Sequence, residues 1–316
     1  MKTHIMEFWP YISGIMPQDM RIELKSEFAS LYRSPSFAGP TAMIPEGITS
    51  EIQQDAARVW EEGRAKNPQL SNSLKPIISS ISDGGRVIRA SLSDYQSSFW
   101  IKNKLNSYAF ETQANIAGQF PFLNVGLITL TSDGKLLIEQ RPEGFTASEM
   151  LLNYPCGYAS NGDRTLADVV DSQCEGELGF DTSATDEAYG TIVKSISAIG
   201  MQRESAEWTP NYVFVMRLNI PYAKIKPTRE TKHLLAFPAD PRRLADSVVE
   251  LYSPATKGNV KGKLIPNATG MLALYIRKTA GESEFLKLVD GLIGAASRQG
   301  HELKLKQYTP KTNPFQ

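Results

Sequence analysis

One stretch, residues 155–180 (P-C-G-Y-A-S-N-G-D-R-T-L-A-D-V-V-D-S-Q-C-E-G-E-L-G-F), constrains the fold more than any other part of the sequence. It opens with a glycine turn, continues through polar residues suited to cap a helix, and ends on glycine after an amphipathic run. Apolar residues recur at helical spacing from Leu166 to Leu178. The stretch therefore predicts a loop, then a helix with one face turned to a core, then a sharp stop.

Two polar side chains lie inside the apolar stripe of this predicted helix. At about 100° per residue, Gln173 and Glu177 fall within roughly 40° of Leu166. A carboxylate in that position needs a partner, or its pKa must rise. Glu177 is therefore a candidate catalytic acid that faces a pocket, and Gln173 beside it is a second catalytic candidate. The alternative is a buried glutamate that bonds to Gln173 or to a basic residue such as Arg141, and both interpretations stay open.

The same stretch resembles the Nudix box, which reads glycine, five residues, glutamate, seven residues, then R-E-U-x-E-E-x-G-U with U aliphatic. The matching positions, with one residue extra before Ser172, are Gly157 for the glycine, Asp163 for the first glutamate, Ser172 for the arginine, Gln173, Gly176 and Glu177 for the later glutamates, and Gly179-Phe180 for the end. The resemblance covers roughly residues 120–295. The preceding region is similar to the N-terminal extension of UDP-sugar-hydrolysing Nudix proteins.

The resemblance implies a fold and a partial site. The expected fold class is α+β, a Nudix-type α/β/α sandwich with an N-terminal α+β subdomain. In the family, the loop before the helix contacts a diphosphate, which places Gly157 and Tyr158 among the substrate-binding candidates. Family glutamates on the helix hold magnesium, but here only Glu177 remains beside Gln173. One carboxylate and one amide carry too little charge for a strong magnesium site. We therefore expect no metal site and no required cofactor, with magnesium needed only if the chain is a hydrolase.

Other candidates lie outside the box. Arg203, Trp208 and Tyr212 occur together in M-Q-R-E-S-A-E-W-T-P-N-Y just before a predicted strand, where an aromatic ring and an arginine can hold a flat ligand. An exposed polar loop with one anchoring tryptophan is the alternative. Glu230 precedes another strand at a position where the family often carries an acid, so it joins the catalytic candidates. Arg141, which ends the strand L-L-I-E-Q-R, joins the substrate-binding ones.

Local patterns predict the organisation of the chain. Residues 1–118 are expected to form an irregular, proline-rich arm and a small α+β subdomain, with a helix at Ser50–Lys66 and a hairpin that turns at Ser82-Asp83-Gly84-Gly85. Residues 119–298 are expected to form the Nudix-like domain. Residues 299–316 read as a polar tail, mobile or strapped over the surface.

Composition narrows the classes of function. Lys+Arg and Asp+Glu both number 34, so the formal net charge of zero argues against broad binding to nucleic acid or to an anionic membrane. Two cysteines cannot make a disulfide framework, and no apolar run is long enough to span a bilayer. We expect a cytoplasmic protein with a small-molecule substrate. The sequence leaves self-association into a homo-oligomer open.

Three hypotheses of function follow. The first is a diverged Nudix-fold enzyme that acts on a small metabolite without the usual magnesium–glutamate cluster, in a specialised biosynthetic pathway. The second is a weak or altered metal-dependent diphosphate hydrolase of nucleotide sugars. The third is a non-catalytic ligand-binding or scaffold protein.

Overall fold

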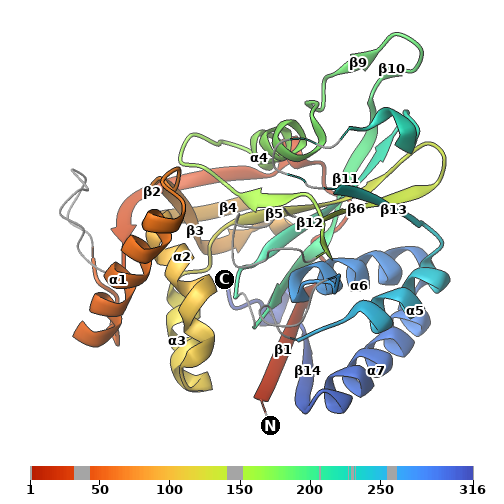
Figure 1. Cartoon of the computed structure of the whole chain (residues 1–316). Coiled ribbons are helices and arrows are strands. Elements are labelled where there is room, and N and C mark those ends of the chain that lie inside the picture. Colours follow the sequence, from red (N-terminus) through yellow and green to blue (C-terminus); the bar gives the residue numbers. More distant parts are fainter. Residues whose placement is uncertain are drawn as a thin grey trace.

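A central sheet with helices on both faces forms the body of the protein (Figure 1). The computed structural model describes residues 2–31, 43–140, 152–205, 208–226, 228, 231, 233–254 and 262–315. Helices α5, α6 and α7 cover one face of the sheet, α4 lies over the other, and α1 to α3 stand to one side (Figure 1). This layering confirms the predicted α/β/α sandwich with an additional N-terminal α+β part.

The central sheet is mixed. Within the described residues it has nine strands, seven of which follow the spatial order β13-β6-β5-β12-β11-β1-β14, while β7 pairs with β6 and β8 with β5. The strands are β1 (Lys2–Trp9), β5 (Asn124–Leu130), β6 (Lys135–Gln140), β7 (Leu152–Asn153), β8 (Cys156–Tyr158), β11 (Val193–Glu204), β12 (Asn211–Leu218), β13 (His233–Pro238) and β14 (His301–Gln307). The β5–β12 and β1–β14 pairs are parallel, and the β5–β6 hairpin is antiparallel as predicted.

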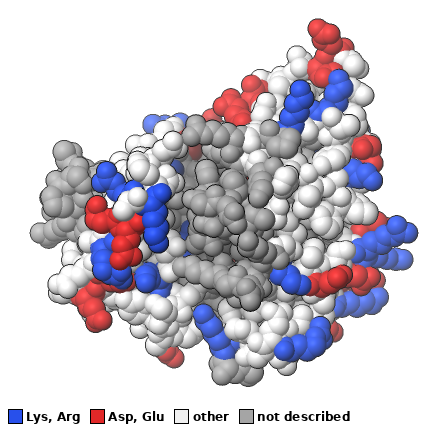
Figure 2. Space-filling model, viewed as in Figure 1, with Lys and Arg blue, Asp and Glu red and all other residues white. Residues whose placement is uncertain are grey.

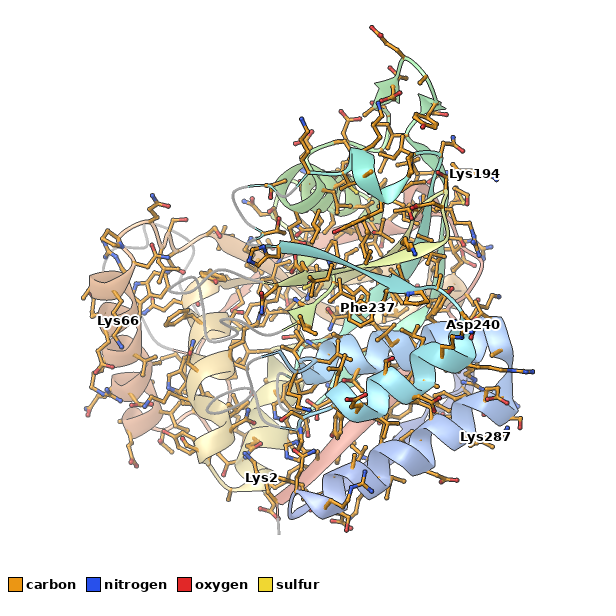
Figure 3. All side chains as sticks on the ribbon, turned by 45° about the vertical axis from the view of Figure 1, so that its right-hand side comes forward. Lys2, Lys66, Lys194, Phe237, Asp240 and Lys287 are labelled. Carbon is orange, nitrogen blue, oxygen red and sulfur yellow. The ribbon has the colours of Figure 1, made fainter. Side chains whose placement is uncertain are left out.

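Alternation along β5 divides the interior into two cores. Val125 and Leu127 pack in the cluster that contains the α4 side chains, whereas Ile128 and Leu130 pack in the cluster of α5, α6 and α7. This follows from the two-residue period of a strand. The helices are α4 (Leu166–Gln173), α5 (Pro241–Leu251), α6 (Pro266–Ala280) and α7 (Glu282–Arg298). Figure 3 shows Asp240, at the start of α5, and Lys287, on α7, on the same side of the molecule.

The N-terminal part has a sheet of its own, ordered β2-β4-β3. Its elements are β2 (Arg21–Ala29), α1 (Ser50–Lys66), β3 (Leu74–Ser82), β4 (Val87–Asp94), α2 (Tyr95–Lys104) and α3 (Phe110–Gln119). The predicted helix and hairpin are both present. The helix cap is Thr49 rather than Ser50, since the Thr49 side chain accepts the backbone N–H of Ile52 at 3.3 Å.

The expectation of an irregular arm is wrong for the described residues, and the polar C-terminal residues include a regular edge strand, β14. β1 lies inside the central sheet, antiparallel to β11, and β14 pairs with β1 in parallel along its whole length. Leu303 is 5% exposed and Phe315 is 7% exposed, so the C-terminal segment belongs to the packed structure. The boundary predicted near residue 118 stays a prediction.

Strand β11 was not predicted, although it is the longest strand in the described ranges. Before it, β9 (Thr185–Asp186) and β10 (Gly190–Thr191) form a small hairpin that projects from the body (Figure 1). Basic and acidic side chains are interspersed over the face shown in Figure 2. Among the helices in the described part of the chain, none combines the length and the apolar content needed to cross a bilayer.

Candidate functional site

The box forms the loop and helix that its sequence predicts, with a change of pitch at the end. Helix α4 continues as a π-helical turn at Cys174–Leu178, and Gly179 stops it with φ 79°. The helix begins at Thr165, whose backbone N–H donates to Asp168 Oδ2 at 2.9 Å. Partial burial works to raise the pKa of Asp168, but hydrogen bonds from Arg164 and Thr165 hold it below its usual range. Asp168 therefore stays charged at the helix N-terminus.

Asp163, the residue in place of the first box glutamate, stabilises the loop instead of the helix start. Its Oδ2 accepts the backbone N–H of Ser160 at 2.6 Å. Burial raises the pKa of Asp163, with a small opposing effect from the nearby charge of Lys75 on β3. Burial also lowers the pKa of Lys75. The two groups lie where the N-terminal sheet meets the box loop.

Backbone N–H groups of the box loop are already used within the chain. The N–H of Ala159 donates to the carbonyl of Leu123 at 3.0 Å, and that of Leu166 donates to the carbonyl of Met20 at 2.9 Å. In return, the N–H of Ile22 donates to the carbonyl of Arg164 at 2.7 Å. The start of β2 is thus tied to the loop that contacts a diphosphate in the family. These donors are occupied by protein rather than available to a phosphate.

Glu177 is buried, as its place in the apolar stripe predicts. Glu177 is only 3% exposed, and its Oε2 accepts a hydrogen bond from the backbone N–H of Cys156 at 2.7 Å. The bond joins the π-turn to β8, the strand of the box glycine. A charge-assisted bond of this kind stabilises the carboxylate inside the protein. A main-chain group is thus one partner of Glu177, while Arg141, a partner that the sequence suggests, lies outside the described residues.

Gln173 and Gly157 are brought into contact. A Cβ placed on Gly157 would lie 2.2 Å from Gln173 Oε1, so the glycine is required by the close approach of the amide. Gly157, Gln173 and Glu177 thus converge at β8. Glu230 and Arg141, the other candidates assigned to this area, lie outside the described residues.

Sequence reasoning missed a second buried carboxylate on the same side of the sheet. Glu139 on β6 is 0% exposed and two residues from Leu137, which packs in the α4 core. Its strand partner is Asn153, whose Nδ2 donates to Cys156 Sγ at 3.1 Å. Contacts between neighbours therefore run from Glu139 to Glu177 through β7 and β8. In L-L-I-E-Q-R the glutamate follows three apolar residues, and this local pattern alone does not predict its burial.

Tyr158 follows the box glycine but turns toward the N-terminal helices. Its hydroxyl accepts from Ser98 Oγ at 2.8 Å, and Lys102 Nζ lies 4.5 Å from the centre of its ring. Both partners belong to α2. The side chain therefore stabilises contact between the two parts of the chain, and its role as a substrate contact stays a prediction.

Arg203 and Trp208 contact each other in a packed cluster. The guanidinium carbon lies 5.8 Å from the centre of the Trp208 ring, and Arg203 Nε donates to Glu7 Oε2 at 2.6 Å. Trp208 is 6% exposed and has φ 57°, an uncommon backbone conformation for tryptophan. Tyr212 is fully buried on β12, and burial raises its pKa well above the usual range. Tyr212 packs in the core on the α4 side of the sheet, whereas Trp208 packs with the N-terminal helices, and the role of these residues as substrate contacts stays a prediction.

The donors at the box positions do not fit a magnesium ion. Gln173 and Gly176 provide no carboxylate, Asp163 bonds to its own loop, and Glu177 bonds to the main chain. Across the described residues, no three histidine, cysteine, aspartate or glutamate side chains gather in a group that could hold a metal. Magnesium prefers several oxygen ligands, usually including carboxylates.

Comparisons with known proteins give likeness in structure only. No protein-family model matches the chain, and no curated protein does. The MutT protein of Methanosarcina mazei matches with 12% identity and a TM-score of 0.32 over 51% of this chain and 95% of that one. An ADP-ribose pyrophosphatase of Streptococcus suis matches with 16% identity and a TM-score of 0.30 over 51% and 94%.

A bifunctional NMN adenylyltransferase/ADP-ribose pyrophosphatase of Francisella tularensis, solved with AMP and a manganese ion, matches with 14% identity and a TM-score of 0.31 over 55% of this chain and 47% of that one. At these values the likeness carries no argument about activity. The predicted α/β/α layering is present in the chain's own sheet and helices (Figure 1).

Proposed function

We propose that this protein is a diverged Nudix-fold enzyme that acts on a small metabolite without the magnesium–glutamate cluster. The observation that carries the proposal is the bond between Glu177 Oε2 and the backbone N–H of Cys156, in a residue 3% exposed. The last box glutamate is used inside the protein. With Gln173 in the neighbouring position, the helix has no carboxylate pair for a cation.

Two buried carboxylates favour an enzyme over an inert scaffold. Glu139 and Glu177 are 0% and 3% exposed. Burial of a charged group costs free energy, and a scaffold could replace both side chains by apolar ones of similar volume. Buried acids with specific partners are candidates for general acid or base catalysis. In this proposal Glu177 exchanges a proton with the substrate, and Glu139 stabilises the arrangement of β6 and β7 beneath it.

The first experiment separates this enzyme from a metal-dependent hydrolase. Phosphate release from UDP-sugars and ADP-ribose is measured with magnesium, with manganese and with a chelator. We expect no chelator-sensitive hydrolysis, because the described donors do not fit the cation. Hydrolysis that requires magnesium and is lost in Glu177→Gln would overturn the proposal and support a nucleotide-sugar hydrolase.

The second experiment tests catalysis itself. The wild type and Glu177→Gln are incubated with small-molecule extracts in the presence of chelator, and consumption of compounds is followed by mass spectrometry. We expect a compound that the wild type consumes and the variant does not, while both unfold at similar temperatures. If neither protein consumes any compound and the substitution changes only thermal stability, a non-catalytic binding protein is the better description.

A further inference from the structure

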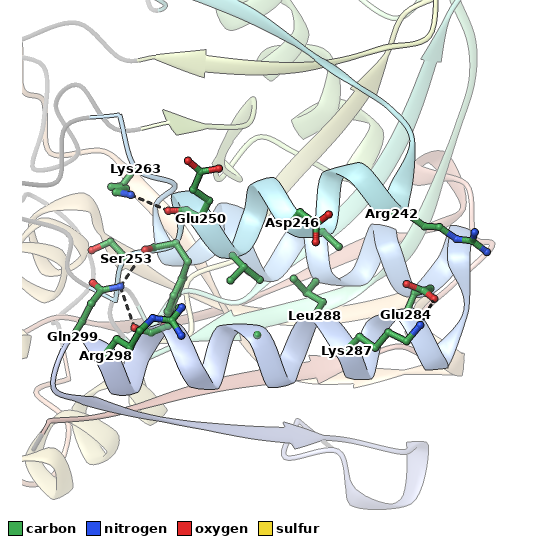
Figure 4. Close-up of a pocket in the computed structure, with 15 residues that line it drawn as sticks. Arg242, Asp246, Glu250, Ser253, Lys263, Glu284, Lys287, Leu288, Arg298 and Gln299 are labelled. Carbon is green, nitrogen blue, oxygen red and sulfur yellow. Dashed lines mark hydrogen bonds and ion pairs between the residues drawn. The ribbon is translucent and has the colours of Figure 1, made fainter.

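A pocket of about 720 Å³ lies between α5 and α7, on the helical face of the sheet opposite to α4 (Figure 4). Its position separates it from the box, so it is a different site from that of the proposed reaction. A volume of this order is within the range of pockets for small organic ligands, about 300–1,000 Å³.

Small residues open the pocket. Ala245 on α5 and Gly291 and Ala295 on α7 line it, while Val249 and Leu288 form its apolar middle. At Gly291 the two helices come so close that an added Cβ would lie 2.8 Å from Val249 Cγ2. The helices therefore meet at one point, and the space beside that contact stays open. The middle of the pocket suits an apolar body.

The basic residues of the lining differ in what they already bind. Lys287 Nζ donates to Glu284 Oε1 at 2.8 Å, and Lys263 Nζ donates to the main-chain carbonyl of Glu250 at 2.8 Å. The hydrogen bond from Lys287, with a smaller contribution from the nearby charge of Arg242, holds the pKa of Glu284 below its usual range. These cations are thus compensated or engaged within the protein.

Arg242 and Arg298 remain, and Arg298 is the one that lies at the end of the pocket away from Glu284 (Figure 4). Within the described residues it forms no ion pair, and Figure 4 shows it at the end of the pocket that also holds Ser253, Lys263 and Gln299. A guanidinium can bind a carboxylate or phosphate through two parallel hydrogen bonds. Asp246, on the α5 side of the same pocket, disfavours a second anionic group near α5.

We propose that the α5–α7 pocket binds a small metabolite with a single anionic group, a carboxylate or a phosphate, on Arg298 and with its apolar body against Val249 and Leu288. The chemistry of the anionic group is common to both ligand classes. The charge of Arg298 determines which end of the ligand binds there, and the apolar middle of the pocket determines how long the apolar part of the ligand can be. Asp246 on α5 disfavours ligands that carry a second anionic group.

Calorimetric titrations of the full chain with acetate, hexanoate, hexyl phosphate and adipate test the proposal. We expect hexanoate to bind more tightly than acetate, by up to about fourfold for each methylene that the pocket buries. Adipate, which has a second carboxylate, is expected to bind more weakly than hexanoate. The relative affinities of hexanoate and hexyl phosphate identify the preferred anion.

Two variants and a matched control locate the binding. Arg298→Gln is expected to weaken hexanoate binding about tenfold, because it removes one charged partner. Lys304→Gln, an equal change of charge on exposed β14, is expected to leave binding unchanged. Ala245→Trp fills the pocket and should abolish binding while circular dichroism remains unchanged. Failure of hexanoate and hexyl phosphate to bind below about 10 mM, or equal affinity of wild type and Arg298→Gln, would overturn the proposal.

Discussion

Gly157 and Gln173 fit together so closely that a Cβ on the glycine would lie 2.2 Å from Gln173 Oε1. The glycine of the box loop thus accommodates the amide that stands in place of a box glutamate. The contact ties β8 to the end of α4, and the bond from Cys156 to Glu177 ties the next turn to the same strand. These residues of the 155–180 stretch stabilise one another.

The contact predicts coupling between these two positions. Gly157→Ala must displace the Gln173 side chain and is expected to lower the free energy of unfolding by about 1 kcal/mol. In a chain that also carries Gln173→Ala, the same glycine substitution should cost less than half as much. Urea unfolding of the four proteins of this cycle measures the coupling, and additive effects would contradict the contact.

Glu177 is expected to stabilise the fold through its bond to Cys156. Glu177→Ala leaves a buried N–H without its partner and opens a cavity, so we expect a loss of about 2–4 kcal/mol. Glu177→Gln keeps an acceptor oxygen and should lose less. The exposed neighbour Glu175 provides the control, since Glu175→Ala is expected to change stability by less than about 0.5 kcal/mol. Equal effects at 175 and 177 would argue against the bond.

A histidine pair predicts loss of stability in mild acid. His4 Nε2 and His301 Nδ1 are 3.2 Å apart, so one ring must be neutral to accept the hydrogen bond. Partial burial, followed by the charges of His4 and Lys2, holds the pKa of His301 below its usual range. The folded state therefore binds this proton less readily than the unfolded state does. The stability that depends on neutral His301 is present above a pH of about 6.5 and is lost as the pH falls below it.

Urea unfolding at pH 7.5 and pH 5.5 measures this effect. The wild type is expected to lose more stability over the interval than His301→Gln, which cannot take up a proton. Subtraction of the two proteins removes the common effect of other titrating groups. If the wild type and His301→Gln lose the same free energy of unfolding between pH 7.5 and pH 5.5, the histidine pair does not control the sensitivity to acid.

Strand β14 is expected to be part of the folding unit. Leu303 is 5% exposed in the core shared with α7, so Leu303→Ala should lower the free energy of unfolding by about 2–5 kcal/mol. The adjacent Lys304 points its charge outward beside Glu302, and Lys304→Ala should cost less than about 0.5 kcal/mol. Equal small losses at both positions would support a loosely attached tail.

The site could be predicted only in part. The helical period placed Glu177 in the core and the glycine signal located Gly157, because both depend on neighbours a few residues away. Glu139 could not be recognised, since its burial depends on α4 covering the face of β6. The contact of the Tyr158 side chain with α2 could not be predicted, and its role as a substrate contact stays a prediction. Tyr158 is the last residue of β8, and the direction of its side chain depends on the elements that pack around it.

The sequence by itself determined the elements built from local contacts: the box loop and α4, the helix α1 and the hairpins β3–β4 and β5–β6. Their signals are period, cap and turn, which act over a few residues. Only the tertiary structure decided that β1 pairs with β11 and β14, whose residues are about two hundred and three hundred positions away in the chain. A strand forms its backbone hydrogen bonds with the strands on either side, and these neighbours also bury its side chains. The strand at Lys2–Trp9 therefore depends on residues that are distant in the chain, and a local sequence pattern does not predict it.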